Sequence, residues 1–209
     1  MDLMEAISNR RSIRKFKQEP VKEEDLREIV AAAIQAPNAS NKQMWKYVAV
    51  TNREIIEQVH EAVSLKVDAI VNACETLGAG KGKKTAGHKF FWTFFRQAPA
   101  IIAVFACPYY GAMEEVEDIL GMKLSFPLPV SAAQQSIGAA VQNISLTAHA
   151  KGYGTTWMYG PVMAHREIAA ILGVPEPWVL SALLPIGIPD ENPKARPRKP
   201  LDEVYCLLK

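Results

Sequence analysis

A cluster of cationic side chains lies near the N-terminus, in the stretch SNRRSIRKF at residues 8–16. Arg10, Ser12 and Arg14 are spaced so that several side chains can converge on one small anion. A guanidinium donates two parallel hydrogen bonds to a phosphate, and a serine hydroxyl adds a further donor. The alternative is a solvated basic turn, because charge clusters are common at protein surfaces. The stretch is therefore a candidate phosphate site.

A second basic stretch, KARPRK at residues 194–199, lies close to the C-terminus. Arg196 and Arg198 are two residues apart, so in an extended chain their side chains point to the same side. The prolines of this stretch reduce the entropy lost when it becomes ordered. Three apolar residues follow that we expect to anchor the tail: Leu201, Val204 and Leu207. The alternative is a disordered basic tail.

A third candidate is the polar loop PNASNKQMW at residues 37–45. Its amide side chains, on Asn38, Asn41 and Gln43, both donate and accept hydrogen bonds, as the edge of a heterocycle requires. The alternative is a loop in which these amides only stabilise the backbone.

Composition limits the classes of protein to which the chain can belong. With 209 residues, of which 49% are hydrophobic, it suits a single domain with a packed core. A net charge of +2 is too small for a dedicated nucleic-acid-binding protein, so the arginines point to a small ligand. Three cysteines without a CxxC pair indicate neither a disulfide framework nor a zinc site, and we expect no metal.

Targeting signals are absent from the sequence as given. The N-terminal residues lack the apolar segment of a signal peptide, and no apolar run is long enough to span a membrane. We therefore expect a protein of the reducing cytoplasm that does not contact membranes.

The elements that must position these residues are a mixture of helices and strands. Apolar periodicity predicts a helix from about Val21 that ends before Pro37, and a long helix over 131–151. Thr51 and Glu54 predict a capping box at the start of another helix. Other segments complete the prediction: short helices at 2–8 and 165–173, strands at 46–51, 100–106 and 178–188, a strand entering a turn within 152–160, and a loop at 77–89.

Taken together, the motifs resemble one family. In chain order they are RRSIRKF at 10–16, APNASNKQMW at 36–45, AVQNI at 140–144, GYGTTW at 152–157, PIG at 185–187 and KARPRKP at 194–200. Their order and spacing are similar to those of the FMN-dependent nitroreductase family. The resemblance implies one α+β domain over 1–209, a three-layer α-β-α sandwich that forms a domain-swapped homodimer. Segments 76–95 and 107–130 match nothing in the family and are expected to shape the substrate side, with 189–209 as an extended tail.

The resemblance also implies where FMN binds. Arg10, Arg11 and Ser12 would hold the phosphate together with Arg196 and Arg198. Arg14 would lie near the pyrimidine end of the flavin. Pro37, Asn38 and Ala39 would come from the partner subunit, and Asn41 and Gln43 are candidates that lie nearby. The backbone of Tyr159 and Gly160 would face flavin N5.

The activity implied by the resemblance is a ping-pong oxidoreductase reaction. Hydride passes from NADH or NADPH to flavin N5, and then to a small acceptor such as a nitroaromatic or a quinone. The flavin carries the chemistry, so no catalytic side chain is expected. Two alternatives stay open: a specialised branch, either a flavin-consuming enzyme or a reductive dehalogenase, and a non-catalytic flavin-binding protein.

Overall fold

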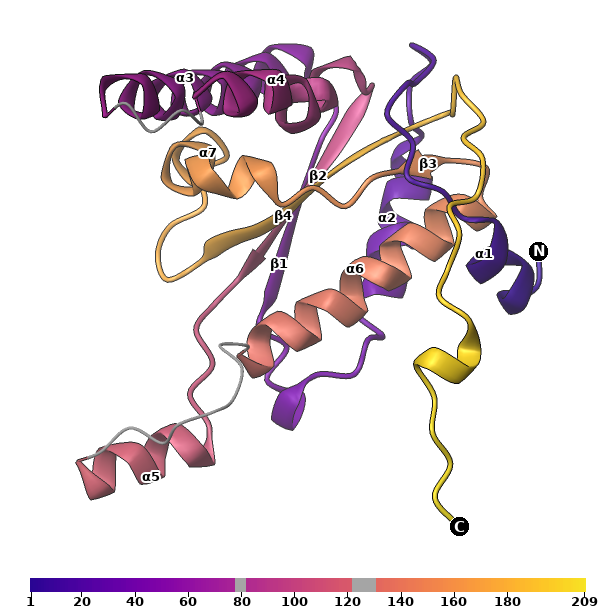
Figure 1. Cartoon of the computed structure of the whole chain (residues 1–209), viewed down its shortest axis with the longest axis vertical. Helices are drawn as coiled ribbons and strands as arrows, with labels where there is room; N and C mark the ends of the chain where they lie inside the picture. Colours follow the sequence, from indigo (N-terminus) through magenta and orange to yellow (C-terminus); the bar gives the residue numbers. More distant parts are fainter. Residues whose placement is uncertain (78–81, 122–130) are drawn as a thin grey trace.

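A computed structural model of the chain describes residues 1–77, 82–121 and 131–209. Its centre is a four-stranded sheet in the order β1-β2-β4-β3, in which all neighbouring strands are antiparallel (Figure 1). The strands are β1 (Trp45–Val50), β2 (Ala100–Ala106), β3 (Gly154–Thr155) and β4 (Val179–Gly187). Strand β1 therefore forms one edge of the sheet within the single chain.

Helices cover both faces of this sheet. Every residue of β2 is buried, and its side chains alternate between two cores. Ile101, Ala103 and Phe105 pack toward α3 (Arg53–Thr76) and α7 (His165–Ile171). Ile102 and Val104 pack toward α2 (Glu23–Ala33) and α6 (Ala132–Ala150). The predicted three-layer α-β-α architecture is confirmed.

Helix boundaries agree with several sequence signals. Helix α1 (Leu3–Asn9) begins after Asp2, whose carboxylate accepts from the backbone N–H of Glu5. Helix α6 is capped by Ser131 in the same way. Helix α7 is followed by Gly173 at φ +64°, the left-handed conformation that favours glycine after a helix.

Two local predictions were wrong. The cap of α3 is not Thr51 but Asn52, whose side-chain oxygen accepts from the N–H groups of Glu54 and Ile55. The predicted loop at 77–89 contains most of a helix, α4 (Gly82–Thr93), while 78–81 lie outside the described residues. Lys89 of α4 pairs with Asp68 of α3 at 2.7 Å, so tertiary contacts hold a segment whose glycines have low helix propensity.

Two segments project away from the body of the chain (Figure 1). One carries α5 (Ala112–Leu120), within the stretch predicted as an irregular insertion, of which residues 122–130 are not described. The other is the C-terminal tail, whose apolar Leu201, Val204 and Leu207 are 61–68% exposed. Within the single chain these residues therefore do not anchor the tail.

Within the described ranges, none of the helices combines the length and the apolar character needed to cross a membrane.

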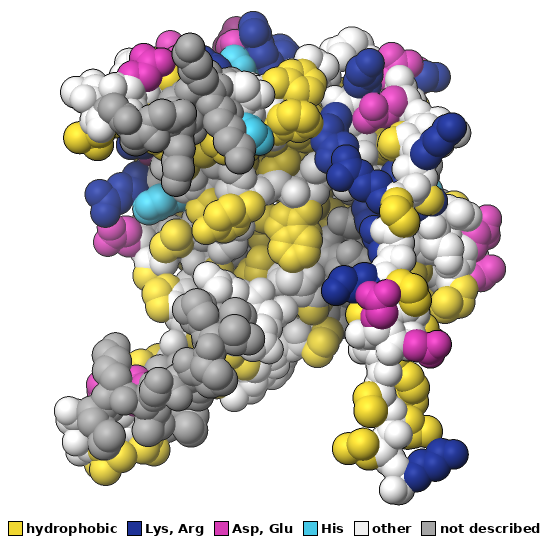
Figure 2. Space-filling view, viewed as in Figure 1, with side chains coloured by type: hydrophobic (Ala, Val, Ile, Leu, Met, Phe, Trp, Pro, Cys, Tyr) yellow, Lys and Arg dark blue, Asp and Glu magenta, His cyan; other side chains and the backbone are white. Residues whose placement is uncertain are grey.

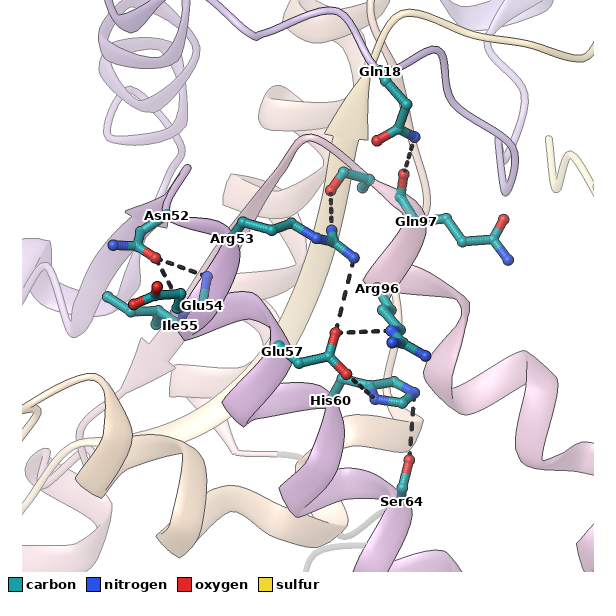
Figure 3. Close-up of polar contacts among 11 residues, drawn as sticks. Gln18, Asn52, Arg53, Glu54, Ile55, Glu57, His60, Ser64, Arg96 and Gln97 are labelled. Carbon is teal, nitrogen blue, oxygen red and sulfur yellow. Dashed lines mark hydrogen bonds and ion pairs between the residues drawn. The ribbon is translucent and has the colours of Figure 1, made fainter.

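A polar cluster ties α3 to the turn before β2 (Figure 3). Glu57 accepts from the Nε of Arg96 at 2.8 Å and lies 3.5 Å from Nδ1 of His60, whose Nε2 is 3.4 Å from the Ser64 hydroxyl. Arg53 approaches the same carboxylate at 3.9 Å. Burial lowers the pKa of His60, and the cations Arg96, Lys89 and Arg53 lower it further against the opposing effect of Glu57.

This cluster predicts that stability depends on pH through His60. Because its folded-state pKa lies below the ordinary 6.5, the unfolded chain binds more protons over the interval beneath 6.5. The contribution of neutral His60 to stability is complete above pH 6.5 and is lost as pH falls through the folded-state pKa. Urea unfolding between pH 7 and pH 5 should therefore show a larger loss of stability for the wild type than for His60→Gln. Equal losses in the two proteins would contradict the assignment.

Candidate active site

The two basic stretches lie side by side because the start of the tail pairs with the N-terminal segment. Lys17 N–H donates to the Ile188 carbonyl at 2.9 Å, and Asp190 N–H donates to the Lys15 carbonyl at 3.0 Å. The Glu191 carboxylate accepts from the backbone N–H groups of Arg14 and Lys15. These contacts cross more than 170 residues of chain, which is why the sequence contains no local signal for Glu191.

Strand β3 holds the other side of the same segment. Ile13 N–H donates to the Thr155 carbonyl at 3.0 Å, and the Thr156 hydroxyl donates to the Ile13 carbonyl at 2.6 Å. A Cβ atom at Gly154 would lie 2.5 Å from the Ile13 side chain, so glycine permits this close approach. The backbone that carries the arginines is thereby fixed at both edges.

The predicted phosphate ligands line a single cavity of about 580 Å³. Six predicted site residues contribute to it: Arg10, Arg11, Ser12, Arg14, Arg196 and Arg198. Lys194 also lines it, a residue that sequence reasoning had not placed in the site. In Figure 2, Lys and Arg side chains form a continuous dark blue band beside the tail.

The charges in this cavity are not balanced by acids. None of the ion pairs found among the described residues involves any of its five arginines. Burial lowers the pKa of Arg10, and so does repulsion from Arg11 and Arg198. Guanidiniums that repel one another are stabilised by a multiply charged anion. The donor set therefore fits a phosphate group.

A smaller cavity of about 270 Å³ adjoins the first, and Arg10 and Arg11 line both. His149, near the C-terminus of α6, contributes to its wall. The Nε2 of His149 is buried and has no hydrogen-bond partner among the described residues. Burial lowers the pKa of this histidine, as do Arg10 and Arg11, while Glu5 opposes them. No motif in the sequence pointed to His149.

Tyr159 and Gly160 lie in the loop that follows β3 and do not line the arginine cavity. Tyr159 is 77% exposed and precedes the 3-10 helix Gly160–Ala164. Gly160 lies directly against the indole of Trp92 on α4. Trp157, in the same loop, reaches Gly138 near the middle of α6.

The loop at 37–43 has an unusual backbone. Ser40, Asn41 and Gln43 all have φ near +50°, a conformation that non-glycine residues rarely adopt. The Asn38 side chain accepts from the Gln43 backbone N–H at 2.8 Å, so in this chain Asn38 stabilises the loop itself. Strain of this kind is found at functional sites that the surrounding structure holds in place.

Within one chain this loop lies away from the arginine cavity. Ala39 N–H donates to the Ser136 hydroxyl near the start of α6, whereas His149 borders the arginines. Ser136 and His149 are separated by about 20 Å along α6, because an α-helix rises 1.5 Å per residue. Trp157 approaches Gly138, which points about 200° around the helix from Ser136. Helix α6 thus separates the loop at 37–43 from the loop at 157–160.

Comparison with known proteins identifies the protein family to which this fold and site belong. The model of the nitroreductase family matches residues 7–188. The chain belongs to the nitroreductase family.

Three relatives show how varied that family is. A protein of Methanothermobacter thermautotrophicus, named provisionally as an NADH dehydrogenase/NAD(P)H nitroreductase, is 29% identical over 94% of this chain and 82% of its own length. The 5,6-dimethylbenzimidazole synthase of Rhodospirillum rubrum is 28% identical over 88% and 80%. The iodotyrosine deiodinase of Thermotoga neapolitana is 25% identical over 97% and 95%.

Solved structures support the same fold. A BluB-like flavoprotein from Clostridium difficile 630 has a TM-score of 0.88 and 27% identity over the whole of both chains. The FMN and NADPH-dependent nitroreductase NfnB from Sphigopyxis sp. strain HMH has a TM-score of 0.75 at 22% identity, also over the whole of both chains, and shows the shared fold.

Proposed function

We propose that the protein is an FMN-dependent oxidoreductase that takes hydride from NADH or NADPH and passes it to a small acceptor such as a nitroaromatic or a quinone. The observation that carries this proposal is the cavity in which arginines from both ends of the chain converge without acidic partners. The similarity to a BluB-like flavoprotein and to an FMN and NADPH-dependent nitroreductase supports the choice of FMN.

Bound FMN would supply the redox chemistry, accepting hydride at N5 and delivering it to the acceptor. Arg10, Arg11, Ser12, Arg196 and Arg198 would hold its phosphate. Arg14 would favour negative charge at the pyrimidine end of the ring. The backbone of Tyr159 and Gly160 would face N5, so we assign no catalytic side chain.

Specialised branches of the family remain the second candidate. The synthase from Rhodospirillum rubrum and the deiodinase from Thermotoga neapolitana are about as similar to this chain as the nitroreductase-like relative. Persistence of the flavin spectrum through repeated turnover in air argues against a flavin-consuming enzyme. Release of iodide from an iodinated phenol would identify the dehalogenase branch.

The direct test of the proposal is the spectrum of the purified protein and its oxidation of NAD(P)H. We expect a yellow protein with about one FMN per chain, because two arginine sets converge on one cavity. Steady-state oxidation of NADH or NADPH should depend on added menadione. A colourless protein that cannot be reconstituted with FMN would refute the proposal, and bound FMN without any turnover would leave a flavin-binding protein.

We also propose that two chains form a domain-swapped homodimer. The separation of the loop at 37–43 from the loop at 157–160 supports this, because a partner's loop can approach the flavin where the chain's own loop cannot. Pro37, Asn38, Ala39, Asn41 and Gln43 would then reach the partner's FMN. The projection of α5 and of the tail away from their own chain is also consistent with a partner (Figure 1).

A further inference from the structure

The contact between Gly160 and Trp92 is closer than any residue other than glycine allows. A Cβ at position 160 would lie 2.3 Å from Cδ1 of Trp92, 2.7 Å from Cγ and 3.1 Å from Nε1. Backbone conformation does not explain the glycine, because the described glycines with positive φ are Gly121, Gly152 and Gly173. Steric exclusion by the indole therefore explains it.

The indole cannot easily move aside. The two atoms nearest to the missing Cβ include Cγ, the ring atom bonded to the Trp92 Cβ, so rotation about χ2 leaves that atom in place. Trp92 packs against the core beneath α3 and stacks on His88 with ring centroids 6.1 Å apart. Helix α4 is held by Lys89 on Asp68 at 2.7 Å and, just beyond its end, by Phe94 and Phe95, which are at most 2% exposed.

The loop on the other side of this contact is open. Trp157 and Tyr159 are 48% and 77% exposed, and hydrophobic side chains gather in the hollow at the centre of Figure 2. One side of the Gly160 backbone is thus in contact with an aromatic ring, while the side chains of Trp157 and Tyr159 in the same loop are exposed to solvent.

We propose that Trp92 is a positioning residue of the redox site, which sets the place of the Gly160 backbone by filling the space that a side chain at 160 would need. Helix α4 is then the outer wall of the site. The inference rests on the proposed function, because it takes the Gly160 amide to face the flavin. Trp92 touches no reacting atom and acts only through Gly160.

A double-mutant cycle tests this inference with Gly160→Ala, Trp92→Ala and the double variant. Four properties are measured: urea unfolding of the apo protein, the FMN dissociation constant, the rate of flavin reduction by NAD(P)H, and the flavin midpoint potential. We expect Gly160→Ala alone to slow reduction at least tenfold and to shift the potential. In the Trp92→Ala background the same substitution should change the rate less than twofold, because the added methyl group has room.

Matched controls separate this contact from general effects. Phe91→Ala removes an exposed ring from the same helix. In that background Gly160→Ala should slow flavin reduction as much as it does in the wild type. Gly87→Ala adds a methyl group on α4 where no atom lies within 4 Å, and should leave the FMN dissociation constant, the reduction rate and the potential unchanged. Its stability should rise, because alanine has a higher helix propensity than glycine. If Trp92→Ala fails to fold, Trp92→Phe replaces it in the cycle. The smaller phenylalanine ring should relieve part of the slowing of flavin reduction caused by Gly160→Ala.

The outcomes distinguish this inference from the proposed function. If Gly160→Ala slows reduction equally with and without Trp92, the positioning role is overturned. If coupling is found in unfolding but not in the potential or the rate, the contact exists without influence on the flavin, and the inference is likewise overturned. A wild-type protein that binds no FMN refutes the proposed function instead, and the assignment of Trp92 to a redox site is lost with it.

Discussion

Replacing Arg198 with alanine should weaken FMN binding by roughly ten- to a hundredfold. The side chain lines the arginine cavity and is close enough to Arg10 to lower the pKa of that guanidinium. If Arg198 holds the FMN phosphate as proposed, its loss removes a charge-assisted hydrogen bond, typically about 1.5–3 kcal/mol, which corresponds to that change in affinity. Hydride transfer occurs at the far end of the cofactor, so turnover at saturating FMN should recover most of its wild-type value.

Arg14→Ala is the informative comparison for this experiment. If Arg14 lies near the pyrimidine end of the flavin, its loss lowers the flavin potential and slows reduction even when FMN is saturating. FMN titration followed by stopped-flow reduction separates the two effects. An unchanged FMN affinity in Arg198→Ala would mean that the tail is a solvated basic segment.

The arginines that line the cavity could be singled out from sequence as a candidate anion site because they are clustered within two short stretches. The RRSIR and KARPRK motifs each place several cations within a few residues, and their chemistry alone indicates an anion. Their meeting in one cavity required the pairing of residues 15–17 with 188–190, which no local pattern contains. Glu191 and His149 contribute single residues from distant segments, so they were missed.

The fold was predictable where burial follows a simple pattern. Strand β2 is an unbroken apolar run because helices cover both of its faces, and α6 carries a clear apolar face. The first two turns of helix α4 were not predicted, because their glycines and lysines resemble a loop and their order depends on contacts such as Lys89 with Asp68, whereas the aromatic run at 90–95 was predicted as helical. The role of Trp92 was hidden for the same reason, since only the folded chain brings it to Gly160.

The exposed face beside β1 bears on how the chain associates. A groove of about 700 Å³ lies between α2 and this edge strand, lined by apolar residues that include Val30, Ile34 and Ala49. Val30 of α2 and Ile34, which caps its C-terminus, remain accessible, with Ile34 45% exposed. The Tyr47 hydroxyl in this groove is buried without a hydrogen-bond partner among the described residues, and burial raises its pKa. An edge strand with an apolar groove is suited to receive another chain.

Removing the apolar residues of the tail should convert the proposed dimer to monomers. Leu201, Val204 and Leu207 are mostly exposed on their own chain, and burying each against a partner is worth about 1.5–3 kcal/mol. Losing even about 4 kcal/mol of this raises the dissociation constant roughly a thousandfold. We therefore expect Leu201→Ser/Val204→Ser/Leu207→Ser to be monomeric by light scattering at a micromolar concentration at which we expect the wild type to be a dimer.

The same variant also tests whether the partner completes the flavin site. It retains Arg196 and Arg198, so the phosphate cavity is intact, yet FMN affinity should fall because the partner's residues 37–43 are lost from the site. Asp202→Asn/Glu203→Gln alters the same turn of the tail without removing apolar surface and should stay dimeric with unchanged affinity. A wild-type chain that is monomeric and still binds FMN tightly would contradict both the dimer and the role given to the loop at 37–43.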